Sequence, residues 1–288
     1  MFHSTESTKK LRQRLQDKGN GKYYSDWTEI LPRTFSIYFT KVFILLGISA
    51  NMITLLSIVA GILAGIFISL SQPIYFILGA LSLLMVTILD CSDGEIARYH
   101  AQNSSTGEYL DRIAAAIIDP TILFGIGLAL FKHTNAQWII TATIIAGFSL
   151  ALMRLSLSYA YVCSIERFMS GANPRISRTN DNPSQRPTCA SIENLIEKPK
   201  LMQKSSLIYF ILDLFLIKTW GMIFWVFGVG ILSAIFININ NNIDVVDLFV
   251  PLLLFYAIFG PLATCYIIYS TVVNKIPDKL LDDAIDLT

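Results

Sequence analysis

Leu89 to Pro120 reads L-D-C-S-D-G-E-I-A-R-Y-H-A-Q-N-S-S-T-G-E-Y-L-D-R-I-A-A-A-I-I-D-P, and this stretch lies between two long apolar segments. It brings four aspartates and two arginines into an otherwise hydrophobic chain: Asp90, Asp93, Asp111, Asp119, Arg98 and Arg112. Ionisable groups placed against a bilayer are costly unless they are used, so they mark functional sites by default. The stretch therefore indicates both a membrane fold and the position of its site.

The spacing of these residues has a helical geometry. If the segment from Met85 to Tyr99 is helical, a step of about 100° per residue aligns four positions along one stripe, with Arg98 at its edge. The four positions are Asp90, Asp93, Gly94 and Ala97. Asp111 and position 115 share one face of the next helix, one turn apart. Two helix ends thus bring three carboxylates together.

Three carboxylates gathered in this way repel one another unless a cation lies among them. Oxygen ligands of this kind suit Mg²⁺ or Mn²⁺ rather than zinc. Gly94, Ala97 and Gly107 have little or no side chain, so a ligand or a neighbouring backbone can approach closely. Arg98 supplies a planar fork for phosphate oxygens. Together these groups are typical of a phosphoryl-transfer site.

The same residues match a family signature. The pattern D-x-x-D-G-x-x-A-R, then eight residues, then G-x-x-x-D-x-x-x-D is typical of the CDP-alcohol phosphotransferases, also called CDP-alcohol phosphatidyltransferases. The sequence resembles this pattern at all fixed positions but the last: Asp90, Asp93, Gly94, Ala97, Arg98, Gly107 and Asp111. At the last position, where the family has an aspartate, this chain has Ala115.

The resemblance implies a fold and a reaction. The fold is a six-helix membrane domain, usually homodimeric, with a catalytic cavity that opens to the cytosol. In the reaction, an alcohol attacks the phosphorus attached to the lipid or alcohol portion of a CDP donor such as CDP-diacylglycerol. CMP leaves, and a phosphodiester results. The expected partners are this donor, a small alcohol acceptor and the bilayer, and no nucleic acid.

The resemblance also implies roles for individual residues. Asp90, Asp93 and Asp111 hold divalent cations, Mg²⁺ or Mn²⁺, in a two-metal site. The nucleotide pocket is lined by residues of the same motif: Asp93, Gly94, Ala97, Arg98 and Gly107.

Alanine at position 115 bears directly on activity. By resemblance, the aspartate expected there is also the base that takes the proton from the attacking alcohol, and the loss of a positioned base typically costs about 10²–10⁴-fold in rate. The chain is then an inactive member that still binds CDP-alcohol and metal, or a divergent enzyme with another base. The two candidate substitutes within the stretch are Asp119, one turn beyond Ala115, and His100, on the linking loop.

The composition indicates a membrane protein. Of its 288 residues, 53% are hydrophobic and 15% are charged, and the mean hydropathy is +0.56. These values exclude an ordinary soluble domain. The four cysteines contain no C-x-x-C pair, so they predict neither a zinc site nor a disulfide framework.

We predict an all-α integral membrane protein with six transmembrane helices, preceded by an amphipathic juxtamembrane helix. Each span has about the 20 apolar residues that a bilayer requires. The predicted spans are 48–70, 74–98, 106–131, 136–162, 219–237 and 247–272. In the first span, Gly61 and Gly65 stand in G-x-x-x-G spacing, which favours close helix packing.

The regions of the chain follow from these boundaries. Residues 1–26 are polar and basic and predict a cytoplasmic tail, and residues 27–46 predict an interfacial amphipathic helix. The six-helix domain spans 47–274 and includes a mobile cytoplasmic loop at 163–204, where Asn, Pro, Ser, Arg and Lys are frequent. Residues 275–288 predict a second cytoplasmic tail.

The start of the first span belongs to the same resemblance. Gly47 to Thr54 reads G-I-S-A-N-M-I-T, with Ala50 where the family usually has proline. Asn51 and Thr54 are expected to face the same layer as the aspartates and to contact the nucleotide. The alternative is that Ser49 or Asn51 caps the helix.

The distribution of Lys and Arg predicts the orientation, because the expected outside connections carry only Lys132. The aspartate motif then faces the cytoplasm. Arg154, inside the fourth span, needs an anionic partner, which is either a phosphate of the donor or acceptor or Asp119 across the bundle. A transporter that uses Asp119 and Arg154 as an ion path is the alternative from another class. The sequence does not name the alcohol acceptor.

Overall fold

The computed structural model describes residues 7–16, 27–100, 105–169 and 245–273, together with four isolated positions between 226 and 232. Every regular element in these residues is helical. The elements are α1 (Thr8–Gln16), α2 (Trp27–Leu46), α3 (Ala50–Ser69), α4 (Pro73–Tyr99), α5 (Ser105–Thr134), α6 (Gln137–Met169), the 3₁₀ helix η2 (Val245–Leu248) and α10 (Phe249–Val273). The all-α class predicted from the sequence is confirmed.

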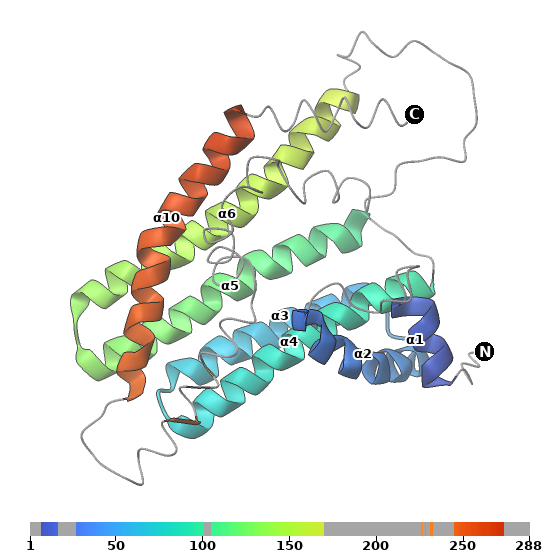
Figure 1. Cartoon of the computed structure of the whole chain (residues 1–288), viewed down its shortest axis with the longest axis horizontal. Helices are drawn as coiled ribbons and strands as arrows, with labels where there is room; N and C mark the ends of the chain where they lie inside the picture. The colour runs from blue at the N-terminus through green and yellow to red at the C-terminus, as the bar shows by residue number, and fades with distance from the viewer. Residues whose placement is uncertain are drawn as a thin grey trace.

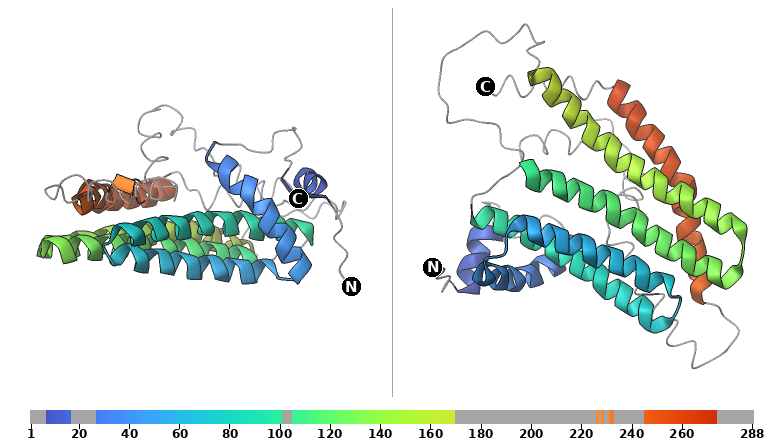
Figure 2. Two further views of the ribbon diagram at one scale, coloured as in Figure 1. Left: turned by 90° about the horizontal axis from the view of Figure 1, so that it is seen from below. Right: turned by 180° about the vertical axis from the view of Figure 1, so that it is seen from behind.

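Helices α3 to α6 lie side by side in a layer, and α10 packs on one side of it. Within the layer, α3 contacts both α4 and α5, and α5 contacts α6, while α10 packs mainly on α6. Figure 1 shows this order, and the edge-on view of Figure 2 shows α10 to one side of the layer. Successive helices run in opposite directions, so the start of α3, the end of α4 and the start of α5 meet at one end of the layer.

A tight turn joins α2 to α3 at this end. Gly47 follows α2 with a φ of 68°, a left-handed conformation that glycine adopts without strain. The amide of Gly47 donates to the oxygen of Ile44 at 3.2 Å, and the amide of Ile48 donates to the oxygen of Phe43 at 3.0 Å. These are the paired bonds of a Schellman motif, which ends a helix and satisfies its last carbonyls. The chain can therefore begin α3 at Ala50.

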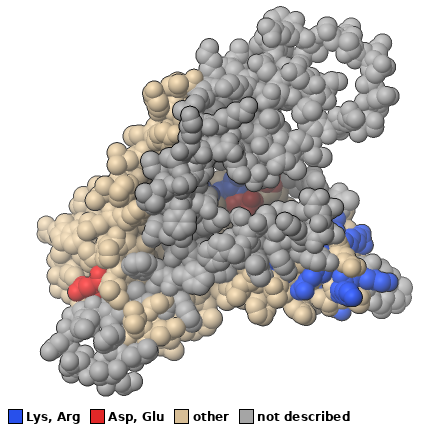
Figure 3. Space-filling view, viewed as in Figure 1, with Lys and Arg blue, Asp and Glu red and all other residues tan. Residues whose placement is uncertain are grey.

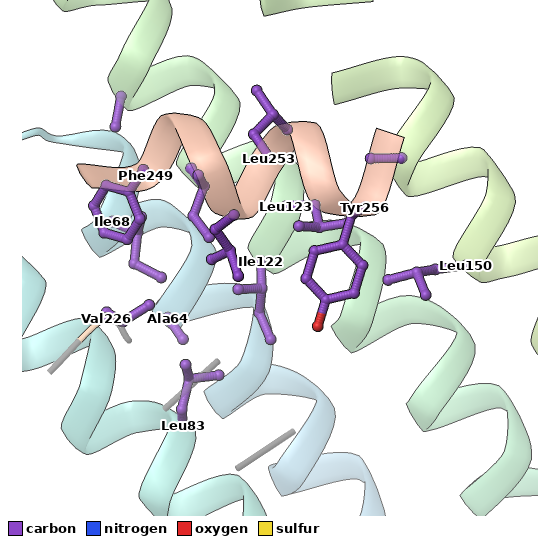
Figure 4. Packing of buried hydrophobic residues seen from close by; sticks show 14 of the residues in the cluster. Ala64, Ile68, Leu83, Ile122, Leu123, Leu150, Val226, Phe249, Leu253 and Tyr256 are labelled. Carbon is purple, nitrogen blue, oxygen red and sulfur yellow. The ribbon is translucent and has the colours of Figure 1, made fainter. Parts of the chain in front are cut away.

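The hydrophobic core lies between α10 and the layer. In Figure 4, Phe249 of α10 lies beside Ile68 of α3, and Tyr256 reaches between Leu123 and Leu150. All five of these side chains are buried. In a membrane, lipid is as apolar as these side chains, so α10 is held against the layer by van der Waals packing.

Two glycines allow α3 and α5 to approach closely. A Cβ atom at Gly61 would lie 2.6 Å from Cγ1 of Ile118, and one at Gly65 would lie 2.7 Å from the backbone oxygen of Thr121. Real Cβ atoms essentially never show contacts this short, so a larger residue at either position would push the two helices apart. The G-x-x-x-G spacing thus serves helix packing.

Five of the described helices are long and apolar enough to cross a membrane. They are Ala50–Ser69, Pro73–Tyr99, Thr106–Thr134, Gln137–Ser156 and Val246–Val273. They correspond to five of the six predicted spans. The remaining predicted span, 219–237, lies outside the described residues except for four isolated positions.

Helix α2 has the bounds that the sequence predicts for the amphipathic helix, and its apolar side faces outward. The exposed large side chains form one stripe: Leu31, Phe35, Tyr38, Val42 and Leu45. The opposite side includes Ser36 and Thr40, which are polar and fully buried. A soluble protein would bury the apolar stripe, whereas a helix at a membrane turns it toward lipid.

Helix α1 lies within residues 1–26, where the sequence predicts a polar tail and no helix. It packs against α2 and α4 through the buried side chains of Leu11 and Leu15. Its exposed side carries Lys9, Lys10 and Arg14. Figure 3 shows Lys and Arg side chains gathered at this end of the molecule.

One predicted boundary is wrong. The sequence predicts a loop from Cys163, but α6 continues without a break to Met169. Residues 163–169 contain no glycine or proline, so nothing in them ends the helix. The rest of the predicted loop and the predicted C-terminal tail lie outside the described residues.

Candidate active site

The candidate site lies where α3 begins, α4 ends and α5 begins. Asp90 and Asp93 lie about one turn apart near the end of α4, and Asp111 lies in the second turn of α5. Because α4 runs opposite to α3 and α5, and α3 packs against both, all three aspartates reach the same end of the layer.

The three carboxylates are close enough to act on one another. Asp90 lies within hydrogen-bonding reach of Asp111, and the negative charge of Asp93 also acts on Asp90. Asp90 and Asp111 are exposed, and Asp93 is partly exposed. Nearby arginines offset part of the repulsion, since Arg33 of α2 attracts Asp90 and Arg98 attracts Asp93.

This donor set fits a hard divalent cation. It consists of carboxylate oxygens, and a cation among them would relieve their repulsion. In the part of the chain that the structure describes, no group of three or more His, Cys, Asp or Glu side chains is gathered as a ready metal site. The ligand set of Asp90, Asp93 and Asp111 therefore stays a prediction, and the convergence of the three carboxylates supports it.

Thr54 connects α3 to the acidic cluster. Its Oγ1 atom donates a hydrogen bond to Oδ2 of Asp93 at 2.7 Å, and the Thr54 side chain is buried. Asn51, about one turn earlier, is partly exposed. Ser49 occupies the position before α3 without a side-chain capping bond, so the capping interpretation does not apply to Ser49.

Arg98 folds back along α4. Its Nε atom donates a hydrogen bond to the backbone oxygen of Leu15 in α1 at 2.9 Å. A Cβ atom at Gly94 would lie 3.4 Å from Nη1 of Arg98, so the missing side chain leaves space beside the guanidinium. Ala97 and Gly107, the other small residues of the motif, are both partly exposed.

Position 115 offers only a methyl group. Ala115 is partly buried on α5, one turn after Asp111. Asp119, one turn further, is 5% exposed, and its Oδ2 atom accepts hydrogen bonds from Nε and Nη2 of Arg154 at 3.2 Å and 2.8 Å. Of the two partners predicted for Arg154, the structure has Asp119.

The remaining residues of the stretch lie at its surface. His100 is exposed at the C-cap of α4, and its ring contacts that of Tyr99 edge to face with centroids 5.1 Å apart. Arg112 pairs with Glu108, one turn earlier, with Nη2 and Oε1 2.7 Å apart. The cysteines within the described residues are free, so no disulfide constrains this region.

Sequence reasoning missed Glu95, which lies on the inner side of α4. Glu95 is fully buried and accepts three short hydrogen bonds, from Gln16 of α1 and from Ser36 and Thr40 of α2. The available signal was a glutamate off the aspartate stripe, in a span where an unpaired charge is costly.

A family comparison can now be set beside this geometry. The protein-family model for CDP-alcohol phosphatidyltransferase matches residues 47–232. The chain belongs to this family. The match spans nearly two thirds of the chain, and it includes α3 to α6 and every position of the motif. No curated protein matches this chain.

Membership of the CDP-alcohol phosphatidyltransferase family makes this protein a transferase by descent. Together with the five long apolar helices, it makes the chain an integral multi-pass membrane protein. Within this transferase domain, the structure brings Asp90, Asp93, Asp111 and Thr54 together. Asp119 and its partner lie further into the bundle.

Proposed function

We propose that this protein transfers a phosphatidyl-type group from a CDP-alcohol, such as CDP-diacylglycerol, to an alcohol acceptor and releases CMP, as a step of phospholipid biosynthesis. The observation that carries the proposal is the convergence of three carboxylates from α4 and α5 beside Arg98. Such a cluster is costly in a membrane protein unless a cationic ligand occupies it.

The residues of the site have separate tasks in this reaction. Arg98 binds the diphosphate through its planar fork, and Gly94 leaves room for the donor against the helix backbone. Thr54 fixes the orientation of Asp93, as its 2.7 Å hydrogen bond supports. A bond forms between the acceptor oxygen and the phosphorus of the donor, and the bond from this phosphorus to the oxygen of CMP breaks, so CMP leaves. The acceptor proton passes to a base, for which Asp119 and His100 are the candidates.

Asp90, Asp93 and Asp111 are the proposed ligands of Mg²⁺ or Mn²⁺. When bound, these ions supply neutralisation of the charge on the entering and leaving oxygens. The three side chains would hold the ions where the end of α4 meets the start of α5.

The second candidate is a family member that binds CDP-alcohol and metal with little or no turnover. Ala115 favours it, because no carboxylate is available where the family has its base. Asp119 is buried and accepts two hydrogen bonds from Arg154, so it must leave this ion pair before it can serve as a base. His100 is exposed and has no such constraint.

The primary test is mass spectrometry of the lipids made by purified protein given CDP-diacylglycerol, Mn²⁺ and a pool of alcohols, with CMP release measured in parallel. A new phosphodiester lipid supports the proposed transfer and identifies the acceptor. Failure to bind either Mn²⁺ or CDP-diacylglycerol would overturn the proposal.

The variant Ala115→Asp distinguishes an active enzyme from a family member that binds its ligands with little or no turnover. A gain in CMP release means that the site is intact and lacks only its base, and the expected gain is about 10²–10⁴-fold. Ala116→Asp is the matched control, because it adds the same group one residue away, on a different side of α5. Unchanged turnover in Ala115→Asp, with activity in the unaltered chain, indicates another base.

A transporter that uses Asp119 and Arg154 is the alternative from another class. The ion pair balances both charges within the bundle, which supports a structural role instead. Arg98→Ala separates the two functions, because an enzyme loses affinity for CDP-diacylglycerol and a transporter has no reason to bind it.

The site faces the cytoplasm in this proposal, and the protein works as a homodimer. The distribution of Lys and Arg supports the orientation, and the family resemblance supports the dimer. In a background with the four native cysteines replaced by serine, an impermeant maleimide should label His100→Cys only from the cytoplasmic side. Mass photometry of the purified protein should give the mass of two chains.

A further inference from the structure

The last turn of α1 contacts the last turns of α4 through successive residues. The backbone oxygen of Leu15 accepts a hydrogen bond from Nε of Arg98 at 2.9 Å. The next residue, Gln16, donates from Nε2 to Oε1 of Glu95 at 2.7 Å. A helix that the sequence does not predict is thus joined to the motif arginine and to the buried glutamate beside it.

Glu95 is held by groups from both N-terminal helices. Ser36 and Thr40 of α2 each donate a hydrogen bond to its carboxylate at 2.6 Å, in addition to the bond from Gln16. Hydrogen bonds to a charged group are stronger than neutral ones, and each buried donor left without its acceptor carries a penalty. Glu95 therefore fixes α1 and α2 against α4 in one arrangement.

Gln16 also joins α1 to α2. Its Nε2 atom donates to the backbone oxygen of Arg33 at 2.7 Å, and its side chain is buried. Two residues earlier, the guanidinium of Arg14 lies over the ring of Tyr99, with Cζ 5.0 Å from the ring centroid. This cation–π contact adds to the docking of α1.

The contact with Leu15 determines how Arg98 is presented. The last carbonyls of a helix have no partner within it, so the oxygen of Leu15 is available to a guanidinium. Because Nε of Arg98 is bonded to Leu15, the plane of the guanidinium is fixed. Its Nη1 and Nη2 atoms lie 3.4 Å and 3.8 Å from the position that a Cβ atom would occupy on Gly94. A free arginine loses about 2 kcal/mol of rotamer entropy on binding, and an arginine that is already fixed loses less.

We propose that α1 is a positioning element of the donor site, and that Gln16 and Glu95 are its positioning residues. Their hydrogen bond docks α1, and the backbone of Leu15 then holds Arg98 in the orientation that receives the diphosphate. The inference rests on the proposed function, because it takes Arg98 as the diphosphate ligand. It predicts an effect on donor affinity rather than on the rate of the chemical step.

The test uses full-length protein with two readouts. One is the Kd for CDP-diacylglycerol in the presence of Mn²⁺, and the other is amide hydrogen exchange of residues 8–16. Gln16→Glu places a second carboxylate against Glu95 and should undock α1, with faster exchange and a Kd about 10-fold higher. Gln13→Glu is the matched control, because Gln13 is exposed on the same helix, and it should change neither readout.

A compensating variant separates positioning from general damage. In the double variant Gln16→Glu with Glu95→Gln, the carboxylate and the amide exchange places. The hydrogen bond between α1 and α4 can then form again, although the bond from residue 16 to the backbone oxygen of Arg33 is lost. This variant should recover slow exchange and a Kd within about 3-fold of the unaltered protein. In the Arg98→Ala background, Gln16→Glu should raise the Kd no further, because α1 acts through Arg98.

The possible failures are distinguishable. If the unaltered protein does not bind CDP-diacylglycerol, the proposed function itself fails. If it binds, and Gln16→Glu undocks α1 without a change in Kd, the positioning role is overturned. An α1 that stays docked in Gln16→Glu, or an equal loss of affinity in the Arg98→Ala background, overturns it as well.

Discussion

Two clusters of charged side chains in this protein differ in how their charge is balanced. At the end of the layer, Asp90 and Asp111 are exposed and lie within hydrogen-bonding reach of each other. Deeper in the bundle, Asp119 is 5% exposed and accepts two hydrogen bonds from Arg154. An ion pair within the chain stabilises the fold itself. Carboxylates that repel one another stabilise the protein only when a cation is bound among them. The first cluster should therefore control binding, and the second should control stability.

Substitution in the acidic cluster should have the largest effect on binding. Asp90→Asn removes one carboxylate and keeps its shape, and we expect the affinity for Mn²⁺ to fall by about 100-fold or more, since loss of even an outer partner of a metal ligand costs about 10–100-fold. Stability without metal should be unchanged or higher, because a repulsion is removed. Titration of Mn²⁺ and thermal unfolding measure the two effects.

A nearby surface carboxylate provides the control for this substitution. Glu108→Gln removes a charge in the first turn of α5, from an exposed residue outside the motif, and should leave Mn²⁺ affinity within about 2-fold. Equal losses in Asp90→Asn and Glu108→Gln would mean that net charge, and not ligation, attracts the ion.

Substitution in the buried pair should have the reverse effect. Asp119→Ala leaves Arg154 without its carboxylate, and we expect a loss of about 3 kcal/mol in unfolding free energy, at the low end for a broken buried pair. The low end applies because the side chain of Arg154 is 28% exposed. Reversible unfolding in mixed micelles measures this loss, and the Kd for CDP-diacylglycerol should not change.

Removal of both members of the pair sharpens the comparison. Asp119→Leu with Arg154→Met should recover more than half of the lost stability, because an apolar pair can replace a buried ion pair at little cost. If Asp119→Ala instead abolishes CMP release and leaves stability intact, Asp119 is the substitute base and the comparison fails.

The smallest effect is expected at the hydrogen bond within the acidic cluster. Thr54→Val keeps the volume of the side chain and removes the donor to Asp93, which should weaken donor binding by about 1 kcal/mol, or about 5-fold in Kd. Ser57→Ala is the control, because the hydroxyl of Ser57 donates to the backbone oxygen of Thr54. A change in Kd as large in Ser57→Ala would point to altered packing of α3.

The convergence of the acidic side chains could be predicted from the sequence because it depends on local periodicity. Asp90, Asp93 and Arg98 lie on one helix, so their spacing alone puts the two aspartates on one face with Arg98 at its edge. Because successive membrane helices run in opposite directions, Asp111 and Thr54 then lie at the same end of the layer as these residues. The same reasoning predicts the bounds of α2 and the class of the fold.

The contacts of Glu95 could not be predicted in this way. Gln16 is 79 positions away in the sequence and Ser36 is 59 away, and no pattern within α4 points to either. Helix α1 has only nine residues and is rich in Lys and Arg, so its composition resembles that of a tail. The early end predicted for α6 has another cause. The polar composition of the segment after Cys163 indicates a loop, but its first residues, up to Met169, contain no glycine or proline that would end the helix.

The order of the elements along the chain has a consequence for biosynthesis. The side chains of the acidic cluster, and the donors to Glu95 in the described part of the chain, occur between Gln16 and Asp111. The acidic end can thus be assembled once α5 has entered the membrane, before the ribosome has made α10. Sequence changes in α10 are therefore free to remodel that side of the layer while the acidic end keeps its geometry.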